Sequence, residues 1–343
     1  MLLLCGLATA CQGFCRLFPG GERWAFHAQF EHVRWEGLHA FDLVFPFFIF
    51  IAGASFPYSH ARQIEKGLSS TRRHLRILKR VVLLCVLGWV YGGRLLGGDF
   101  ANFSFLHWTV LGIIGFAWGT AAFTYLHAGI RTRLIVVVLL LVGYWAALRF
   151  VAPDAPPGAT SFSAEGWILG AADRQGFPSW IPLAMFGYST SAFFGMFAGE
   201  IVRSAREGFS SLRKVGALTG FGIALLAFGL ALEPTCPLIK NIWTPSYALV
   251  SGGLAFLVFA LFYFIIDVRG CGRWCFPLEV VGANAIVAYM LPRLIDFEKA
   301  SKFFFGSLAN LCPTPDFVLA CGQTLLVWTV LWFLYRNRTF MRV

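Results

Sequence analysis

The stretch TPSYALVSGGLAFLVFALFYFII, from Thr244 to Ile266, contains no charged residue. A helix needs about 20 consecutive, mostly apolar residues to cross the hydrocarbon core of a bilayer, and this stretch is long enough. A helix that is apolar on all sides lies either in the core of a large protein or in a membrane. The segment therefore predicts a transmembrane helix, provided that the rest of the chain has the same character.

The composition of the whole chain meets that condition. Of the 343 residues, 58% are hydrophobic and only 13% are charged, whereas charged residues make up about 25% of a typical soluble domain. These values exclude a water-soluble globule, and they exclude a disordered chain because disorder requires low hydrophobicity. The net charge of +11 is not gathered on an otherwise polar surface, so we expect no nucleic-acid partner. The chain is predicted to be an integral membrane protein.

Apolar runs separated by charged, Gly-rich or Pro-rich segments predict the individual spans. They lie at residues 1–18, 38–57, 78–97, 104–126, 133–152, 180–202, 214–232, 244–266, 277–295 and 316–335. We therefore expect an all-α, polytopic membrane protein with about ten transmembrane helices. With so little sequence outside the spans, residues 1–343 are predicted to form a single membrane domain.

The distribution of Lys and Arg predicts the orientation, because positively charged loops stay on the cytoplasmic side. With the N-terminus inside, the inner segments hold 18 Lys and Arg residues and the outer segments hold 10. Both termini are therefore predicted to be cytoplasmic. The loop at residues 19–37 then lies outside the cytoplasm.

Two residues at the start of the second span are candidates for catalysis. His32 lies in the outer loop just before the span, and an imidazole can accept a proton near neutral pH, as a general base must. The alternative is that its loop only lies on the membrane surface, where Trp24 and Trp35 suit the interface. Asp42 lies inside an otherwise apolar run, where a carboxylate is functional by default. The alternative for Asp42 is a favourable interaction with the helix N-terminus.

Two further segments are candidates for binding the substrate. The segment KNIWTPSY opens the eighth span, and its polar and aromatic side chains suit a sugar: Lys240, Asn241, Trp243 and Ser246. The alternative is capping by Thr244 or Ser246, with Pro245 in the first turn and Trp243 at the membrane interface. In GANAIVAYMLPR, Asn284 and Tyr289 lie mid-span and can donate hydrogen bonds into a cavity. They serve equally well as structural polar contacts between helices.

A basic run between Arg62 and Arg80 has the charge that a phosphate-bearing cofactor requires. The residues that we assign to such a cofactor are Arg72, Arg73, Arg76 and Arg80. Such a run is also what the orientation rule and anionic lipid headgroups would produce. No pattern typical of a metal site is present, and we expect no metal.

Three segments together resemble a known family. The stretch HVRWEGLHAFDLVFPFFIFIAGASF (His32 to Phe56) is similar to the long signature of the heparan-α-glucosaminide N-acetyltransferase family and its bacterial relatives. KNIWTPSYALVSGGLAFLVFALFYFIIDVRG (Lys240 to Gly270) and GANAIVAYM (Gly282 to Met290) resemble two further elements of that family. The C-terminal LYRNRTFMRV is also similar to the usual ending of these proteins.

The resemblance implies a multispan acetyltransferase that takes an acetyl group from cytoplasmic acetyl-CoA. It delivers the group to an amino sugar or oligosaccharide on the other side of the membrane, here the bacterial inner (plasma) membrane. The catalytic histidine of the family falls on His32. That residue acts either as a general base or as a transient acetyl carrier, and Asp42 orients it. The sequence leaves N- or O-acetylation and a homodimer open.

The sequence departs from the family pattern at several places. The short basic segment before the first span has no counterpart before Met1, so the natural start is left open. The fourth span reads VLGIIG (Val110 to Gly115) without the usual arginine, and the turn before the sixth span reads GFPS (Gly176 to Ser179). Two alternatives therefore remain: a secondary transporter that uses Asp42 and Glu200 as ion sites, and an inactive relative that binds glycans.

Overall fold

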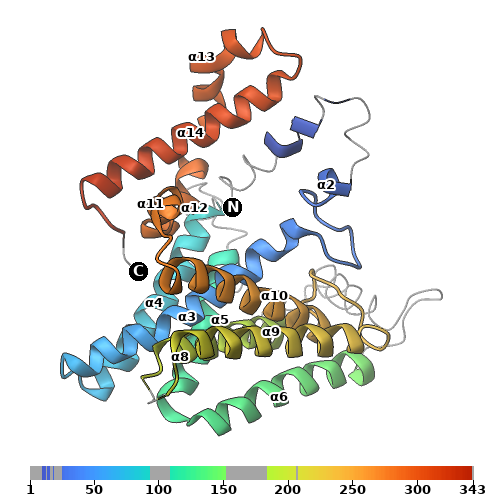
Figure 1. Ribbon diagram of the computed structural model, residues 1–343, viewed down its shortest axis with the longest axis vertical. Helices are drawn as coiled ribbons and strands as arrows, with labels where there is room; N and C mark the ends of the chain where they lie inside the picture. Colours follow the sequence, from blue (N-terminus) through green and yellow to red (C-terminus); the bar gives the residue numbers. More distant parts are fainter. Residues whose placement is uncertain are drawn as a thin grey trace, which may run out of the picture. The chain divides into compact units, whose positions relative to one another are not determined.

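The computed structural model describes residues 10–12, 14, 15, 18, 25–92, 109–151, 184–205 and 208–341 (Figure 1). Their named elements are all helices, beside one isolated antiparallel bridge between Glu36 and Ile239, so the predicted all-α class is confirmed for this part of the chain. The described residues divide into two compact units. The smaller unit takes its residues from Met1–Val33, His39–Val44 and Cys271–Val343, and the larger unit from Arg34–Leu38 and Phe45–Gly270.

The larger unit is a bundle of long helices. In its described part these are α3 (Val44–Glu65, from Phe45 on), α4 (Ser70–Tyr91), α5 (Val110–His127), α6 (Ile130–Ala146), α8 (Ala184–Arg203), α9 (Ser211–Leu232) and α10 (Pro245–Tyr263). Two π-helical turns, η4 (Ala147–Val151) and η5 (Phe264–Val268), extend α6 and α10. Figure 1 shows α9 and α10 side by side, with α6 running along the outer side of the bundle.

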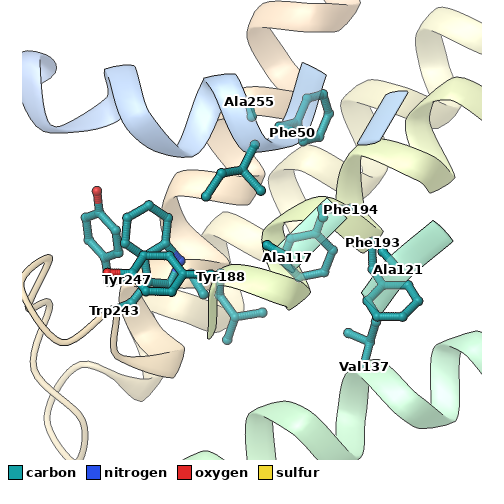
Figure 2. Close-up of a cluster of buried hydrophobic side chains, with 14 of the residues drawn as sticks. Phe50, Ala117, Ala121, Val137, Tyr188, Phe193, Phe194, Trp243, Tyr247 and Ala255 are labelled. Carbon is teal, nitrogen blue, oxygen red and sulfur yellow. The ribbon is translucent and has the colours of Figure 1, made fainter. Parts of the chain in front are cut away.

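The core of the larger unit is rich in aromatic side chains. Figure 2 shows Trp243, Tyr247 and Tyr188 gathered at one end, with Phe193 and Phe194 of α8 farther along. Fourteen of the twenty residues of α8 are buried. Helix packing in membranes relies on such close contact, because lipid tails remove most of the hydrophobic driving force.

The crossing of α3 and α8 depends on glycine. A Cβ atom at Gly195 or Gly199 of α8 would overlap the backbone carbonyl of Phe50 or of Ala54, respectively. Gly53 of α3 meets the backbone of α8 in the same way. The two helices therefore pack backbone against backbone at these positions.

The start of α10 is capped as the TPSY sequence predicts. The hydroxyl of Thr244 accepts a hydrogen bond from the backbone N–H of Tyr247, and Pro245 occupies the first helical position. A proline is tolerated there because its missing N–H would have no helical partner. Of the two capping residues that the sequence left open, Thr244 and Ser246, Thr244 is the N-cap.

The smaller unit contains short helices and one long one. Its described elements are α2 (Ala25–Ala28), η2 (Ala40–Leu43), η6 (Arg273–Cys275), α11 (Phe276–Ala283), α12 (Ala285–Leu294), α13 (Phe297–Ala309) and α14 (Pro315–Arg336). Helices α13 and α14 pack against each other. A small core around Val280, Phe297 and Leu331 holds α11 and α13 to α14. Helix α13 contains the charged residues Glu298, Lys299 and Lys302 in its first two turns, and no apolar run in the sequence predicted it.

Six described helices are long and apolar enough to cross a membrane: Ala40–Glu65, Val110–His127, Ile130–Arg149, Ser211–Leu232, Pro245–Val268 and Pro315–Arg336. The pair Arg273–Ala283 and Ala285–Leu294, bent by 62°, makes a seventh if it is one span. Each of the seven coincides with a predicted span, so the protein is a polytopic membrane protein.

The predicted number of ten spans is not confirmed. Helices α4 and α8 match two more predicted spans but do not meet the same criterion of length and hydropathy in the described chain. Most of the first predicted span and the segment GFPS lie outside the described residues.

Candidate functional site

The loop that follows α2 is folded on itself by short-range hydrogen bonds within the smaller unit. The side chain and the carbonyl of Gln29 accept the backbone N–H groups of Ala40 and Phe41, each at 3.0 Å. The Nδ1 atom of His39 donates to the carbonyl of Glu31 at 3.0 Å. These hydrogen bonds hold the loop in place around His32 and Asp42.

Asp42 lies in η2, the single 3-10 turn that leads into α3, and its side chain is fully buried. Its Oδ1 atom accepts a hydrogen bond from Nδ1 of His32 at 2.7 Å. Its Oδ2 atom accepts the backbone N–H groups of Val33 at 3.3 Å and of His39 at 3.1 Å. Because these groups donate hydrogen bonds to the ionised carboxylate, they offset the loss of hydration on burial.

These contacts bear on both interpretations of Asp42 that the sequence leaves open. The bond to the N–H of His39 places Asp42 in a capping box at the start of η2. The bond to His32 makes it the partner of the candidate base. The same carboxylate therefore fixes the local backbone and the imidazole at once.

His32 presents one edge of its ring to Asp42 and the other edge away from it. The side chain is 44% exposed, and its ring lies 4.6 Å from the ring of Phe41, centroid to centroid. A carboxylate can only accept a hydrogen bond, so a neutral His32 in this contact carries its proton on Nδ1. The lone pair is then on Nε2, which is the atom that can take a proton from a substrate.

The four arginines assigned to a cofactor point in different directions around α4. Arg76 lines a pocket of about 520 Å³ in the larger unit, together with Arg62 and Lys66. Arg73 donates to Nε2 of His60 at 3.0 Å, whereas the guanidinium of Arg80 stacks on the ring of Trp118 at 4.2 Å. Arg72 is exposed.

The structure therefore brings only Arg76 of these four into a basic pocket. Arg62 and Lys66, its neighbours there, belong to the same basic run but come from the end of α3 and the turn after it. The charge of the run was visible in the sequence. The sequence did not show which face of each helix lines the pocket.

Most of the segment KNIWTPSY is packed inside the larger unit. Trp243 is fully buried, donates from Nε1 to the hydroxyl of Ser191 at 3.1 Å, and packs on Tyr188. Its φ of 53° is in the left-handed region, a strain that the surrounding packing holds in place. Ser246 is also buried and donates to the carbonyl of Pro237 at 2.9 Å. These contacts favour the structural interpretation.

The other two residues of that segment are more accessible. Asn241 is exposed and Lys240 is half-buried. A sugar contact at either residue stays a prediction, as does ring stacking on Trp243.

Asn284 lies at the break between α11 and α12 and fastens the C-terminal segment. Its Nδ2 atom donates to the carbonyl of Thr339 at 3.0 Å, and its Oδ1 atom accepts the N–H of Met341 at 3.0 Å. Because both polar atoms of this buried side chain bond to the backbone, the structure favours the structural interpretation of Asn284. Tyr289 is half-buried on α12.

Two other predictions concern Glu200 and metals. Glu200 of α8 accepts a hydrogen bond from Nη2 of Arg133 at 2.8 Å, so it forms an ion pair within the larger unit. In the part of the chain that the structure describes, no three His, Cys, Asp or Glu residues are grouped to hold a metal ion.

Two known proteins are similar to this chain in sequence. The human heparan-alpha-glucosaminide N-acetyltransferase is 24% identical over an alignment that covers 95% of this chain and 57% of the human protein. The chain is a distant homologue of that enzyme. The mouse heparan-alpha-glucosaminide N-acetyltransferase is also 24% identical, with 83% of this chain and 51% of the mouse protein covered. No protein-family model matches the chain.

The chain thus spans about half the length of these two N-acetyltransferases. The aligned part includes nearly all of the sequence, in agreement with the resemblance that three separate segments indicated.

The structure also gives a reason for one glycine of the signature HVRWEGLHAFDLVF. Gly37 has a φ of 112°, which favours glycine, and its N–H donates to the carbonyl of Leu238 at 2.8 Å.

Proposed function

We propose that the protein is a transmembrane acetyltransferase that uses acetyl-CoA to acetylate an amino sugar on the other side of the membrane. The observation that carries the proposal is the contact of 2.7 Å between Nδ1 of His32 and the buried Asp42, which presents Nε2 as a proton acceptor. The distant homology to an N-acetyltransferase supports the same reaction class. The orientation follows from the Lys and Arg distribution, with the His32 loop outside the cytoplasm of a bacterial cell.

In this proposal, Nε2 of His32 takes the proton that the acceptor amine or hydroxyl loses as it attacks the thioester carbonyl. The imidazolium that results then gives this proton to the departing CoA thiolate. Asp42 has two parts in the cycle: it keeps the Nδ1–H tautomer in the resting state and stabilises the positive charge of the ring. This use of a carboxylate and a histidine is a common solution for acyl transfer.

A two-step route uses the same residues. Nε2 of His32 attacks the thioester carbonyl, the thiolate leaves, and the acetylated ring is then attacked by the acceptor. The contact with Asp42 serves both routes, because each requires a lone pair on Nε2. Acid quenching followed by mass spectrometry separates them, since only the second route leaves 42 Da, about the mass that acetyl adds, on the peptide that contains His32.

For the phosphates of CoA we propose the basic pocket of Arg62, Lys66 and Arg76. Cationic side chains bind phosphate oxygens through charge-assisted hydrogen bonds. The pocket contains three cations and four uncharged side chains, from Ser55, Tyr58, Ser59 and Gln63. None of the described residues that line it is a carboxylate that would repel the diphosphate.

For the acceptor we propose a terminal amino sugar or oligosaccharide, by analogy with the name of the human relative. Lys240 and Asn241 are the accessible residues of the sugar-binding prediction. Nothing in this reaction requires a second copy of the chain.

The test is acetyl transfer from labelled acetyl-CoA to a panel of amino sugars by the purified full-length chain in detergent. Wild type should transfer, and His32→Ala should lose about 10²- to 10⁴-fold in rate, the usual contribution of a general base. His127→Gln, in a histidine at the end of α5, is the control and should transfer at the wild-type rate. Failure of the folded wild type with every acceptor would favour the glycan-binding or transporter alternatives.

The phosphate pocket has a separate test. Arg76→Gln should raise the KM for acetyl-CoA about tenfold, since one charge-assisted hydrogen bond contributes about 1.5 to 3 kcal/mol. Lys79→Gln removes an exposed charge of the same helix that does not line the pocket, and it should leave KM unchanged. Equal effects of both variants would mean that only the overall charge of α4 matters.

A further inference from the structure

A cavity of about 1020 Å³ lies in the larger unit and shares no lining residue with the basic pocket. Helices α6, α8, α9 and α10 line it. On α9 the lining residues form one stripe: Arg213, Ala217, Phe221, Leu225 and Phe228. Their spacing of three or four residues places them on one face of the helix. The stripe is apolar except for its first member.

The charged end of this groove contains a buried arginine, two of whose nitrogens have no hydrogen-bond partner among the described residues. Arg133 of α6 is only 5% exposed and lines the cavity. One of its nitrogens, Nη2, bonds to Glu200, and its guanidinium stacks on the ring of Tyr125 at 4.3 Å. Its Nε and Nη1 atoms are buried without a hydrogen-bond partner among the described residues. Each unsatisfied buried donor costs about 1 to 3 kcal/mol, and more when it is charged, so an anionic acceptor at this position would stabilise the protein.

A second arginine lies at the same end. Arg213, in the first turn of α9, lines the cavity together with Arg133, and among the described residues that line it Glu200 is the only acidic one. The first turn of α6 also contains Arg133, so both cations lie near helix N-termini. Helix N-termini favour anions because their N–H groups lack helical partners. Charge and backbone polarity therefore favour the same kind of ligand.

The apolar part of the groove has the length of a lipid tail. The apolar members run from Ala217 to Phe228, eleven positions apart on α9, which is about 16 Å at a rise of about 1.5 Å per residue. One leaflet contributes about half of a hydrocarbon core of about 30 Å. An acyl chain that crosses a leaflet can therefore lie along the stripe with its headgroup at the arginines.

We propose that this groove binds an anionic membrane phospholipid. One acyl chain lies along the stripe of α9, and the phosphate accepts hydrogen bonds from Arg133 and Arg213. A small soluble anion would leave the apolar stripe unused, whereas an uncharged hydrocarbon would leave the donors of Arg133 unsatisfied. A phospholipid meets both requirements, and this proposal does not depend on the acetyl-transfer reaction.

The test uses the full-length chain, purified in detergent and stripped of lipid. Native mass spectrometry measures the binding of phosphatidylglycerol and of phosphatidylcholine. Wild type should bind phosphatidylglycerol at least tenfold more tightly. Arg213→Gln should reduce that preference at least fivefold, and Ala217→Trp, which fills the groove, should weaken the binding of both lipids at least tenfold.

Matched variants separate the groove from the general surface. Arg131→Gln removes an exposed charge from the same turn of α6, and Ala224→Trp adds the same bulk to α9 outside the stripe. Both should bind phosphatidylglycerol like wild type. Equal loss in the groove variants and in these controls would overturn the proposal, as would equal affinity of wild type for the two lipids.

Two competitors test the identity of the occupant. Inorganic phosphate at millimolar concentration should not displace phosphatidylglycerol, because it gains nothing from the apolar stripe. Acetyl-CoA should not displace it either. Displacement by phosphate alone would reassign the arginines to a free anion, and displacement by acetyl-CoA would reassign the groove to the acetyl donor. Either result would overturn the lipid proposal.

Discussion

Asp42→Asn tests how the His32–Asp42 pair works, because it keeps the size of the side chain and changes only its donors and acceptors. In the wild type both carboxylate oxygens accept: Oδ1 from His32, and Oδ2 from the N–H groups of Val33 and His39. An asparagine has only one oxygen. If that oxygen keeps the two backbone bonds, its NH₂ group faces Nδ1 of His32.

The asparagine therefore inverts the tautomer of His32. Nδ1 must now accept, so the proton of the neutral ring moves to Nε2, and the atom that faces the substrate loses its lone pair. We expect kcat to fall about 10²- to 10⁴-fold, the range for loss of general-base catalysis. The ¹⁵N chemical shifts of His32 in labelled protein should show the proton on Nε2.

The effect on stability should be smaller. Loss of one charge-assisted hydrogen bond is expected to reduce the free energy of unfolding by about 1 to 3 kcal/mol. Asp42→Ala would in addition leave the part-buried N–H groups of Val33 and His39 without this partner, at up to about 1 to 3 kcal/mol each. Thermal unfolding in detergent should therefore rank wild type above Asp42→Asn, and Asp42→Asn above Asp42→Ala.

A double-mutant cycle separates an effect through His32 from an effect elsewhere. If Asp42 acts only by orienting the ring, Asp42→Asn should cause no further loss of activity in a His32→Ala background. Two results would refute the reasoning: a folded Asp42→Asn variant with more than half of the wild-type kcat, or a full additional loss in the double variant.

Three other perturbations test the fold. Gly195→Ala should destabilise the protein by about 1 to 3 kcal/mol, because the added Cβ would overlap the backbone of α3 where α3 and α8 cross. Gly216→Ala, in open space on α9, is the control and should be neutral or stabilising by up to about 1 kcal/mol. Equal shifts in melting temperature for the two variants would contradict this. Asn284→Ala should speed hydrogen exchange of the C-terminal segment and lower the free energy of unfolding by about 1 to 3 kcal/mol, because two hydrogen bonds are lost. Unchanged exchange would show that Asn284 does not hold this segment in place. The hydrogen bond from the backbone N–H of Lys299 lowers the pKa of Asp296, the cap of α13. Since this folded-state pKa is depressed, the cap stabilises α13 at pH values above the unfolded pKa of about 3.9, and the stabilisation is lost as the pH falls through the folded pKa. Asp296→Asn should remove this pH dependence from the amide hydrogen exchange of α13.

The sequence predicts the local features of this protein well, for identifiable reasons. The spans follow from apolar runs such as Thr244 to Ile266, since a bilayer imposes a minimum length on them. The cap at Thr244 follows from a threonine directly before a proline. His32 and Asp42 are only ten residues apart in the chain, so their contact was within the reach of local reasoning.

The features that the sequence does not predict depend on distant parts of the chain. Asn284 is bonded to Thr339 and Met341, and Arg133 to Glu200, and no periodicity relates such positions. The aromatic and polar side chains of KNIWTPSY suit a sugar site, but burial of Trp243 within the larger unit became visible only in three dimensions.

The most direct test of the central claim is the rate of acetyl transfer by His32→Ala with and without added imidazole. Because the side chain of His32 is 44% exposed, a small base can enter the space that the variant leaves beside Asp42. We predict that the variant loses about 10²- to 10⁴-fold in kcat and that imidazole, but not a salt of equal ionic strength, restores part of the rate. A folded His32→Ala variant that transfers acetyl groups at the wild-type rate would contradict the role assigned to His32.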